Sequence, residues 1–203
     1  MTNKSEKSFA MANVISRIFD TPVMTLGIFL IFLIKTILLK EKIGIILSSV
    51  ILLWNLFIPV TYFLILYKSK KISDFDISRR EERVKWFFAL VLFWMTTLLL
   101  FNFFEVPHLI FTFQLWLVIF GITNACITVF WKISGHAMLS VSLVLWLTFL
   151  VNKIFFSLLF VFVPLIIWAR IKANKHTLSQ LITGSVLMFF ITLFIWYFMI
   201  FKS

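Results

Sequence analysis

Two histidines with basic and hydroxyl neighbours are the residues of this sequence best suited to chemistry. His136 directly follows Ser134 and Gly135, and His176 lies six residues after Arg170. Imidazole near neutral pH serves as a base, a nucleophile or an acid. Arginine binds phosphate oxygens through paired N–H donors. These residue types in these positions favour a site for phosphate or a similar anion.

The composition says what kind of molecule holds these residues. Of the 203 residues, 62% are hydrophobic and 13% are charged, and there are 27 Phe and 8 Trp. A soluble domain has roughly 45–50% apolar and about 25% charged residues. Since the mean hydropathy is +1.08, a water-soluble globular protein is nearly excluded. The sequence predicts an all-α fold, a polytopic integral-membrane helical bundle.

Long apolar runs predict the individual helices. They span residues 22–39, 43–67, 86–104, 109–131, 137–168 and 178–201. The run 137–168 is too long for one crossing, so we expect a helical hairpin with Asn152 and Lys153 at its turn. Seven transmembrane helices are therefore expected, with six as the alternative. We expect residues 1–20 to form a polar, uncleaved N-terminal segment and residues 21–203 to form a single membrane domain.

The basic residues are unevenly distributed over the two ends of this bundle. The chain has 19 Lys and Arg against 8 Asp and Glu, a formal charge of +11. The charged segments 68–85, 132–136 and 170–176 are separated by helical hairpins, so we expect all three on one face with the N-terminus. Lys and Arg accumulate in cytoplasmic loops in any case, which is the simplest explanation. Because two of the three histidines lie with these bases, an anion site is favoured.

The sequence motifs at this face resemble those of the type 2 phosphatidic acid phosphatase superfamily, which is related to vanadium-dependent haloperoxidases. That family carries a Lys followed by Arg-Pro, then Pro-Ser-Gly-His, then Ser-Arg, five residues, His, three residues and Asp. The second motif here is Lys132-Ile133-Ser134-Gly135-His136. The third is Ala169-Arg170, five residues, His176, three residues and Gln180. The resemblance covers about residues 68–184.

The first motif is the loosest match. The segment 71–83 supplies the bases Lys71, Arg79, Arg80 and Arg83. It has no Arg-Pro pair, and its spacing differs from that of the family. The segment therefore places its bases differently from the family pattern.

The resemblance implies hydrolysis of a phosphate ester through a phosphohistidine. His176 would attack the phosphorus, and His136 would protonate the leaving alcohol. The phosphate oxygens would be bound by Arg170, Lys71, one of Arg79, Arg80 and Arg83, the Ser134 hydroxyl and the Gly135 N–H. No cofactor and no metal site is implied.

Three departures from the family bear on activity. Gln180 stands where the family has Asp, and it supplies no charge, so His176 should be a weaker nucleophile. The Gln180 amide oxygen can still accept an N–H from the ring. Ile133 in place of Pro removes a stiff turn, and Ala169 in place of Ser removes a phosphate donor. Three readings stay open: a slower or specialised phosphatase, a phosphotransferase using the same intermediate, or a binding protein without turnover.

The sequence therefore predicts a phosphatase of a lipid or isoprenoid phosphomonoester or diphosphate, multi-pass in the plasma membrane. The alternative is a weak or inactive relative that binds lipid headgroups or serves as a subunit. No nucleic-acid partner is expected. A transporter is disfavoured because the spans lack paired charges and Gly or Pro breaks. The charge count places the basic face in the cytoplasm, whereas the resemblance places the active face on the other side.

Several other polar residues are expected to be structural. His108 is expected on the opposite face, as an interfacial loop residue. Four polar side chains within the spans are expected to tie helices together, namely Asn55, Asn102, Gln114 and Asn124. The single Cys126 excludes a disulfide within the chain and a cysteine-based metal cluster.

Overall fold

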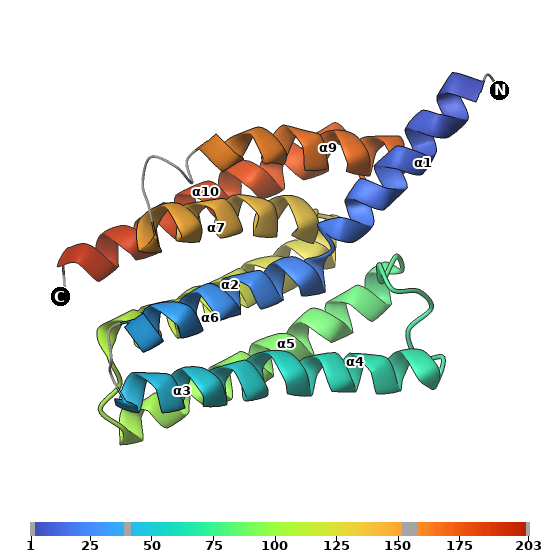
Figure 1. The fold of residues 1–203 in the computed structure, drawn as a ribbon. Helices are drawn as coiled ribbons and strands as arrows, with labels where there is room; N and C mark the ends of the chain where they lie inside the picture. Colours follow the sequence, from blue (N-terminus) through green and yellow to red (C-terminus); the bar gives the residue numbers. More distant parts are fainter. Residues whose placement is uncertain (1–2, 39–41, 152–157, 202–203) are drawn as a thin grey trace. The chain divides into compact units, whose positions relative to one another are not determined.

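All regular structure of the described residues is helical. The computed structural model describes residues 3–38, 42–151 and 158–201 (Figure 1). The elements in chain order are α1 (Asn3–Ile18), α2 (Thr21–Leu38), α3 (Lys42–Leu52), the π-helix η1 (Leu53–Phe57), α4 (Ile58–Lys68), α5 (Arg80–Leu100), the 3₁₀ helix η2 (Phe101–Phe103), α6 (His108–Phe130), α7 (Gly135–Leu150), the 3₁₀ helix η3 (Leu158–Val161), α9 (Phe162–Lys172) and α10 (Leu178–Phe201). The all-α class expected from the sequence is confirmed.

Several of these helices are long and apolar enough to cross a bilayer. The five such stretches in the described residues are Glu6–Leu38, Ile45–Lys68, Arg80–Phe103, His108–Phe130 and Leu178–Phe198. The helix Gly135–Leu150 is apolar but shorter. A run of about 20 apolar residues spans the hydrocarbon, so the chain is a membrane protein. The expected count of six or seven spans stays a prediction.

The predicted and observed helices differ mainly at their polar ends. The segment 1–20, expected as a polar segment, is helical from Asn3 to Ile18. Helix α5 begins at Arg80, before the apolar run, because Glu81 and Glu82 in its first turn suit the positive helix end. Asn152 and Lys153, expected at a hairpin turn, lie outside the described residues.

The chain divides into two compact units. The first unit holds residues 3–31, 133–151 and 158–193, and the second holds 32–38, 42–132 and 194–201. The second and third motifs therefore belong to the first unit, and the first motif belongs to the second unit. Each unit is described by itself below.

In the first unit, α9 packs against both α1 and α7. A core of Val141, Leu145 and Val163 joins α7 to α9, and Phe189 of α10 packs on it. Gly184 brings α10 close to the start of α7, since a Cβ there would lie 3.2 Å from the Ser134 carbonyl oxygen and 3.1 Å from Met138 Cγ. Glycine at this position lets α10 approach the α7 start.

In the second unit, Pro59 explains the π-helix that interrupts the helical stretch from α3 to α4. An α-helical Asn55 carbonyl would accept a bond from the N–H of residue 59, and proline has none. The backbone widens instead, with the Ile58 N–H donating to the Leu53 carbonyl. The Asn55 carbonyl accepts from the Trp94 indole N–H of α5 at 3.1 Å.

The Asn55 side chain extends this polar network to α6. Its amide donates to Gln114 Oε1 at 2.7 Å, and its oxygen accepts from the Thr97 hydroxyl at 2.9 Å. Gln114 in turn donates to the Trp94 carbonyl at 2.7 Å. The expectation that Asn55 and Gln114 tie helices together is confirmed. Asn102 and Asn124 instead donate to carbonyls of their own turn, at Leu99 and Phe120.

We expect Gln114→Leu to destabilise the second unit by about 1–3 kcal/mol, because it leaves the Asn55 amide and the Trp94 carbonyl without this partner in a buried setting. Thermal unfolding of the purified protein in detergent measures the effect. The matched control is Asn102→Ala, which removes an exposed amide that bonds within its own turn. A loss no larger than that of the control would contradict the prediction.

Candidate functional site

The start of α7 positions the residues of the second motif. Ser134 is the N-cap, and its hydroxyl accepts from the Ala137 N–H at 3.4 Å. Gly135 and His136 are then the first two residues of the helix. The N–H groups of a first helical turn have no acceptor within the helix and carry partial positive charge. An anion placed at this helix end would meet backbone donors from a fixed direction.

The start of α10 positions the nucleophile candidate of the third motif. Thr177 and Gln180 form a reciprocal capping box, in which the Gln180 N–H donates to the Thr177 hydroxyl at 3.4 Å. The Thr177 N–H donates back to Gln180 Oε1 at 3.1 Å. The same Oε1 lies 3.1 Å from Nδ1 of His176. The contact expected between Gln180 and the His176 ring is therefore present.

This geometry fixes the tautomer of His176. A backbone N–H can only donate, so the Gln180 atom that faces Thr177 must be the oxygen. Since an amide oxygen only accepts, His176 Nδ1 must carry the hydrogen in the contact between them. In the neutral ring the lone pair then lies on Nε2. Nε2 is the nitrogen that could attack an electrophile.

Arg170 lies at the end of α9 and is held by a residue far away in the sequence. The residue is 3% exposed, and its guanidinium donates from one terminal nitrogen to the Ser16 hydroxyl of α1 at 2.7 Å. The helix ends just after it in a Schellman motif, with Asn174 at φ 53° and the Lys175 N–H bonded to the Arg170 carbonyl at 3.1 Å. This turn leads directly into His176.

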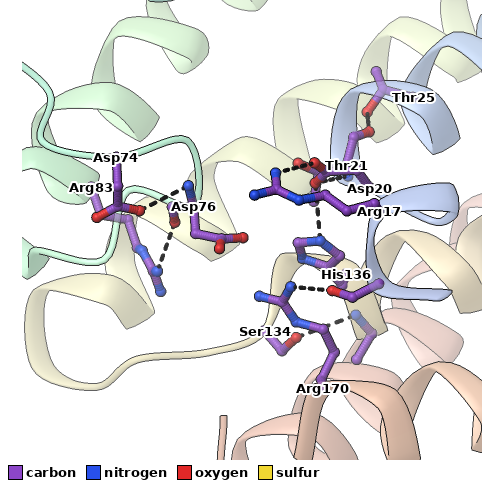
Figure 2. A network of polar contacts seen from close by, with 12 residues as sticks. Arg17, Asp20, Thr21, Thr25, Asp74, Asp76, Arg83, Ser134, His136 and Arg170 are labelled. Atoms are coloured by element: carbon purple, nitrogen blue, oxygen red, sulfur yellow. Dashed lines mark hydrogen bonds and ion pairs between the residues drawn. The ribbon is translucent and has the colours of Figure 1, made fainter. Parts of the chain in front are cut away.

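The junction of α1 and α2 reaches His136. Asp20 lies between the two helices, and its Oδ1 is 3.0 Å from His136 Nε2. The same oxygen accepts from the Thr21 N–H at 2.8 Å, so Asp20 also caps α2. Figure 2 shows the His136 ring against Asp20, with Arg17 on the other side of the carboxylate and 3.7 Å from Oδ2.

Ser16 and Asp20 lie four residues apart, about one helical turn. One binds Arg170 and the other binds His136. The first unit therefore brings Arg170, His136 and Ser134 together at one polar end (Figure 2). His176 and Gln180 lie at the start of α10, which approaches Ser134 at Gly184, two helical turns further on.

The bases of the first motif lie in the second unit, around the turn that joins α4 to α5. Lys71, Arg79 and Arg80 are exposed, and Arg79 forms an ion pair with the half-buried Glu82 at 3.7 Å. Arg83 is buried and donates to the Ile77 carbonyl at 3.1 Å and the Asp76 carbonyl at 3.2 Å. Arg83 thus holds the turn, a role that the sequence did not reveal.

Asp74 and Glu82 organise the same turn. The Asp74 carboxylate accepts from the N–H groups of Asp76 at 2.9 Å and Ser78 at 3.2 Å. Glu82 accepts from both the N–H and the hydroxyl of Ser73, at 2.8 and 2.9 Å. These bonds give the turn a defined shape although its bases are largely exposed.

Asp20 and Ser16 are the site residues that the sequence did not predict. Their signal was weak but present: Asp20-Thr21-Pro22 is a helix start, with a capping side chain just before a proline in the first turn. That signal predicts a cap and does not predict the histidine partner. Ser16 has no local signal, because its contact with Arg170 spans more than 150 residues.

Comparison of the chain with known protein families, with curated proteins and with solved structures gave no match. The resemblance to the type 2 phosphatidic acid phosphatases stays a prediction, and it rests on the motifs alone.

We expect Arg83→Ala to loosen the turn between α4 and α5. Loss of a charged donor to two carbonyls should raise amide hydrogen exchange of Asp76, Ile77 and Ser78 by about tenfold to a hundredfold. Hydrogen–deuterium exchange with mass spectrometry measures it. The control is Arg79→Ala, which removes an exposed side chain and its ion pair from the same turn and should change exchange little. Equal exchange in both variants would contradict a structural role of Arg83.

Proposed function

We propose that this protein is an integral-membrane phosphatase of a lipid or isoprenoid phosphate that works through a phosphohistidine at His176. The observation that carries the proposal is the contact of Gln180 Oε1 with both the Thr177 N–H and His176 Nδ1. It gives a neutral His176 the tautomer with its lone pair on Nε2. A nucleophilic histidine needs that arrangement.

The first step forms a P–N bond and breaks a P–O bond. His176 Nε2 attacks the phosphorus, and the leaving oxygen takes a proton from His136. Arg170 and the N–H groups at the α7 start bind the phosphoryl oxygens, where negative charge builds up. Ser134 caps the helix that supplies these N–H groups.

The second step returns the protein to its initial state. Water attacks the phosphorus of the phosphohistidine and gives a proton to His136, which is neutral after the first step. The P–N bond breaks, inorganic phosphate leaves, and His136 is again protonated. The atoms balance with water as the only co-reactant.

The membrane setting supports a lipid substrate. The long apolar helices provide a surface for acyl or isoprenoid chains, while the polar helix ends of the first unit provide the groups for the phosphate. A plasma-membrane location and a contribution from Lys71, Arg79, Arg80 or Arg83 remain parts of the proposal that rest on the sequence.

The second candidate function is headgroup binding without turnover. The observation that favours it is Gln180 itself, because a neutral amide does not stabilise the positive charge that develops on an attacking imidazole. In that case the same helix ends and Arg170 would hold an anionic headgroup.

We expect the purified protein to release phosphate from at least one of phosphatidate, phosphatidylglycerophosphate and polyprenyl diphosphate, and His176→Ala to abolish the release. The control is His108→Ala, which removes a histidine at the start of α6 and should leave the rate unchanged. Incubation with ³²P-labelled substrate and acid-free quenching should trap an alkali-stable label on wild type and on His108→Ala but not on His176→Ala. No release, no label and no effect of His176→Ala would refute the phosphatase. Lipid binding lost in Arg170→Ala would then support headgroup binding.

We expect Gln180→Glu to raise the rate of phosphate release by roughly tenfold, about 1.4 kcal/mol of barrier. Glutamate keeps the capping box and adds the charge that stabilises the attacking imidazole. Gln180→Leu should lower the rate, because it leaves the His176 ring without this acceptor. Steady-state assays on the same substrate compare the two, and His108→Ala is again the control. A rate that falls equally in both Gln180 variants would contradict this role of position 180.

A further inference from the structure

The two histidines of the first unit have chemically different partners. His176 Nδ1 contacts a neutral amide oxygen at 3.1 Å, and His136 Nε2 contacts a carboxylate oxygen at 3.0 Å. A nearby anion stabilises the protonated form of an imidazole, and a neutral acceptor does so much less. Two titratable groups with opposite environments are the usual basis for dividing acid and base roles within one site.

The carboxylate that contacts His136 has no equivalent elsewhere in this unit. The sequence of the first unit contains two acidic residues, Glu6 and Asp20, and the stretch from 133 to 193 contains none. Glu6 lies fourteen residues earlier, roughly 20 Å along a helix. Any negative charge that this unit offers to the imidazole of His136 therefore comes from Asp20.

The other charged groups of the first unit that Figure 2 draws near His136 have the opposite sign. Among the described residues of the first unit, Figure 2 draws Arg17, Asp20 and Arg170 around it. Two cations disfavour a proton on the ring, and Asp20 compensates for them. His136 is 6% exposed, so water screens these interactions only in part.

We propose that Asp20 is the positioning residue of His136, which it binds at Nε2 and keeps in the protonated form, so that Nδ1 donates the proton to the leaving oxygen. The N-terminal segment then contributes two residues to the site: Ser16 of α1 binds Arg170, and Asp20, just after α1, binds His136. This proposal rests on the proposed function for the fate of the proton. The protonation of His136 itself does not depend on any substrate.

The first test follows protonation without a substrate. Protein with ¹⁵N-labelled histidine is titrated by NMR in detergent micelles, with the His136 signal assigned from its loss in His136→Gln. In Asp20→Asn, His136 should lose its second proton at a lower pH than in wild type. Asparagine still caps α2, so the helix start is preserved. Glu6→Gln removes an equal charge from α1 and should leave the titration unchanged.

The second test follows catalysis with the substrate that the wild type hydrolyses. Asp20→Asn should lower kcat by roughly tenfold to a hundredfold, part of what a positioned proton donor contributes. The alkaline limb of the kcat–pH profile of Asp20→Asn should move to lower pH. Asp20→Glu should restore part of the kcat and part of the position of this limb. A merely structural role would not move that limb.

The outcomes separate the two proposals. An unchanged His136 titration in folded Asp20→Asn, with the wild-type melting temperature, would overturn the role of Asp20 whatever the activity. An active Asp20→Asn with an unshifted alkaline limb would overturn it as well. If no substrate is hydrolysed but the titration shifts as expected, the proposed function fails while the control of His136 by Asp20 stands.

Discussion

The Asp20 carboxylate is the interaction on which the polar end of the first unit depends. It caps α2 through Thr21, contacts His136 at the start of α7, and lies beside Arg17 of α1. A half-buried carboxylate with these partners is satisfied by hydrogen bonds and by opposite charge at once. Without it, the ends of α1, α2 and α7 would meet with positive groups alone. Asp20 thus contributes both to the packing of these helix ends and to the negative charge beside His136.

Helix ends carry the polar groups because the helices themselves are built for lipid. Within α7, for example, the hydroxyls of Ser140 and Ser142 bond to carbonyls of their own helix. Catalytic or anion-binding groups must then sit in the first or last turns, where backbone donors and acceptors also lack partners. The Ser134 cap, the Thr177 box and the Schellman turn after Arg170 follow from this constraint. These three features fix the backbone at the helix ends that carry the predicted site residues.

The sequence predicted what local physics determines. Apolar runs predicted the bounds of α2 and α6 closely, because lipid demands a continuous apolar length, but they did not predict α1 in the polar segment 1–20. Gln180 at the third position after Thr177 could be read as the acceptor for His176, because the capping box is local. The partners of His136 and Arg170 could not be read, since Asp20 and Ser16 come from packing between distant segments. Asn55 and Gln114 lie between these cases. Their role as helix ties was predictable, but their partners on α5 and α6 come from packing between helices.

The position of the carboxylate also bears on which step of a reaction is favoured. In the family that the motifs resemble, the Asp lies beside the nucleophile, whereas here an amide lies beside His176 and the carboxylate lies beside His136. After His136 has given up its proton, the adjacent carboxylate makes the neutral ring a better proton acceptor. Under the proposed function, the attack of water on a phosphohistidine requires a proton acceptor, so this arrangement would assist the second step. Under the proposed function, the attack of His176 is then the step that lacks a carboxylate beside the attacking ring.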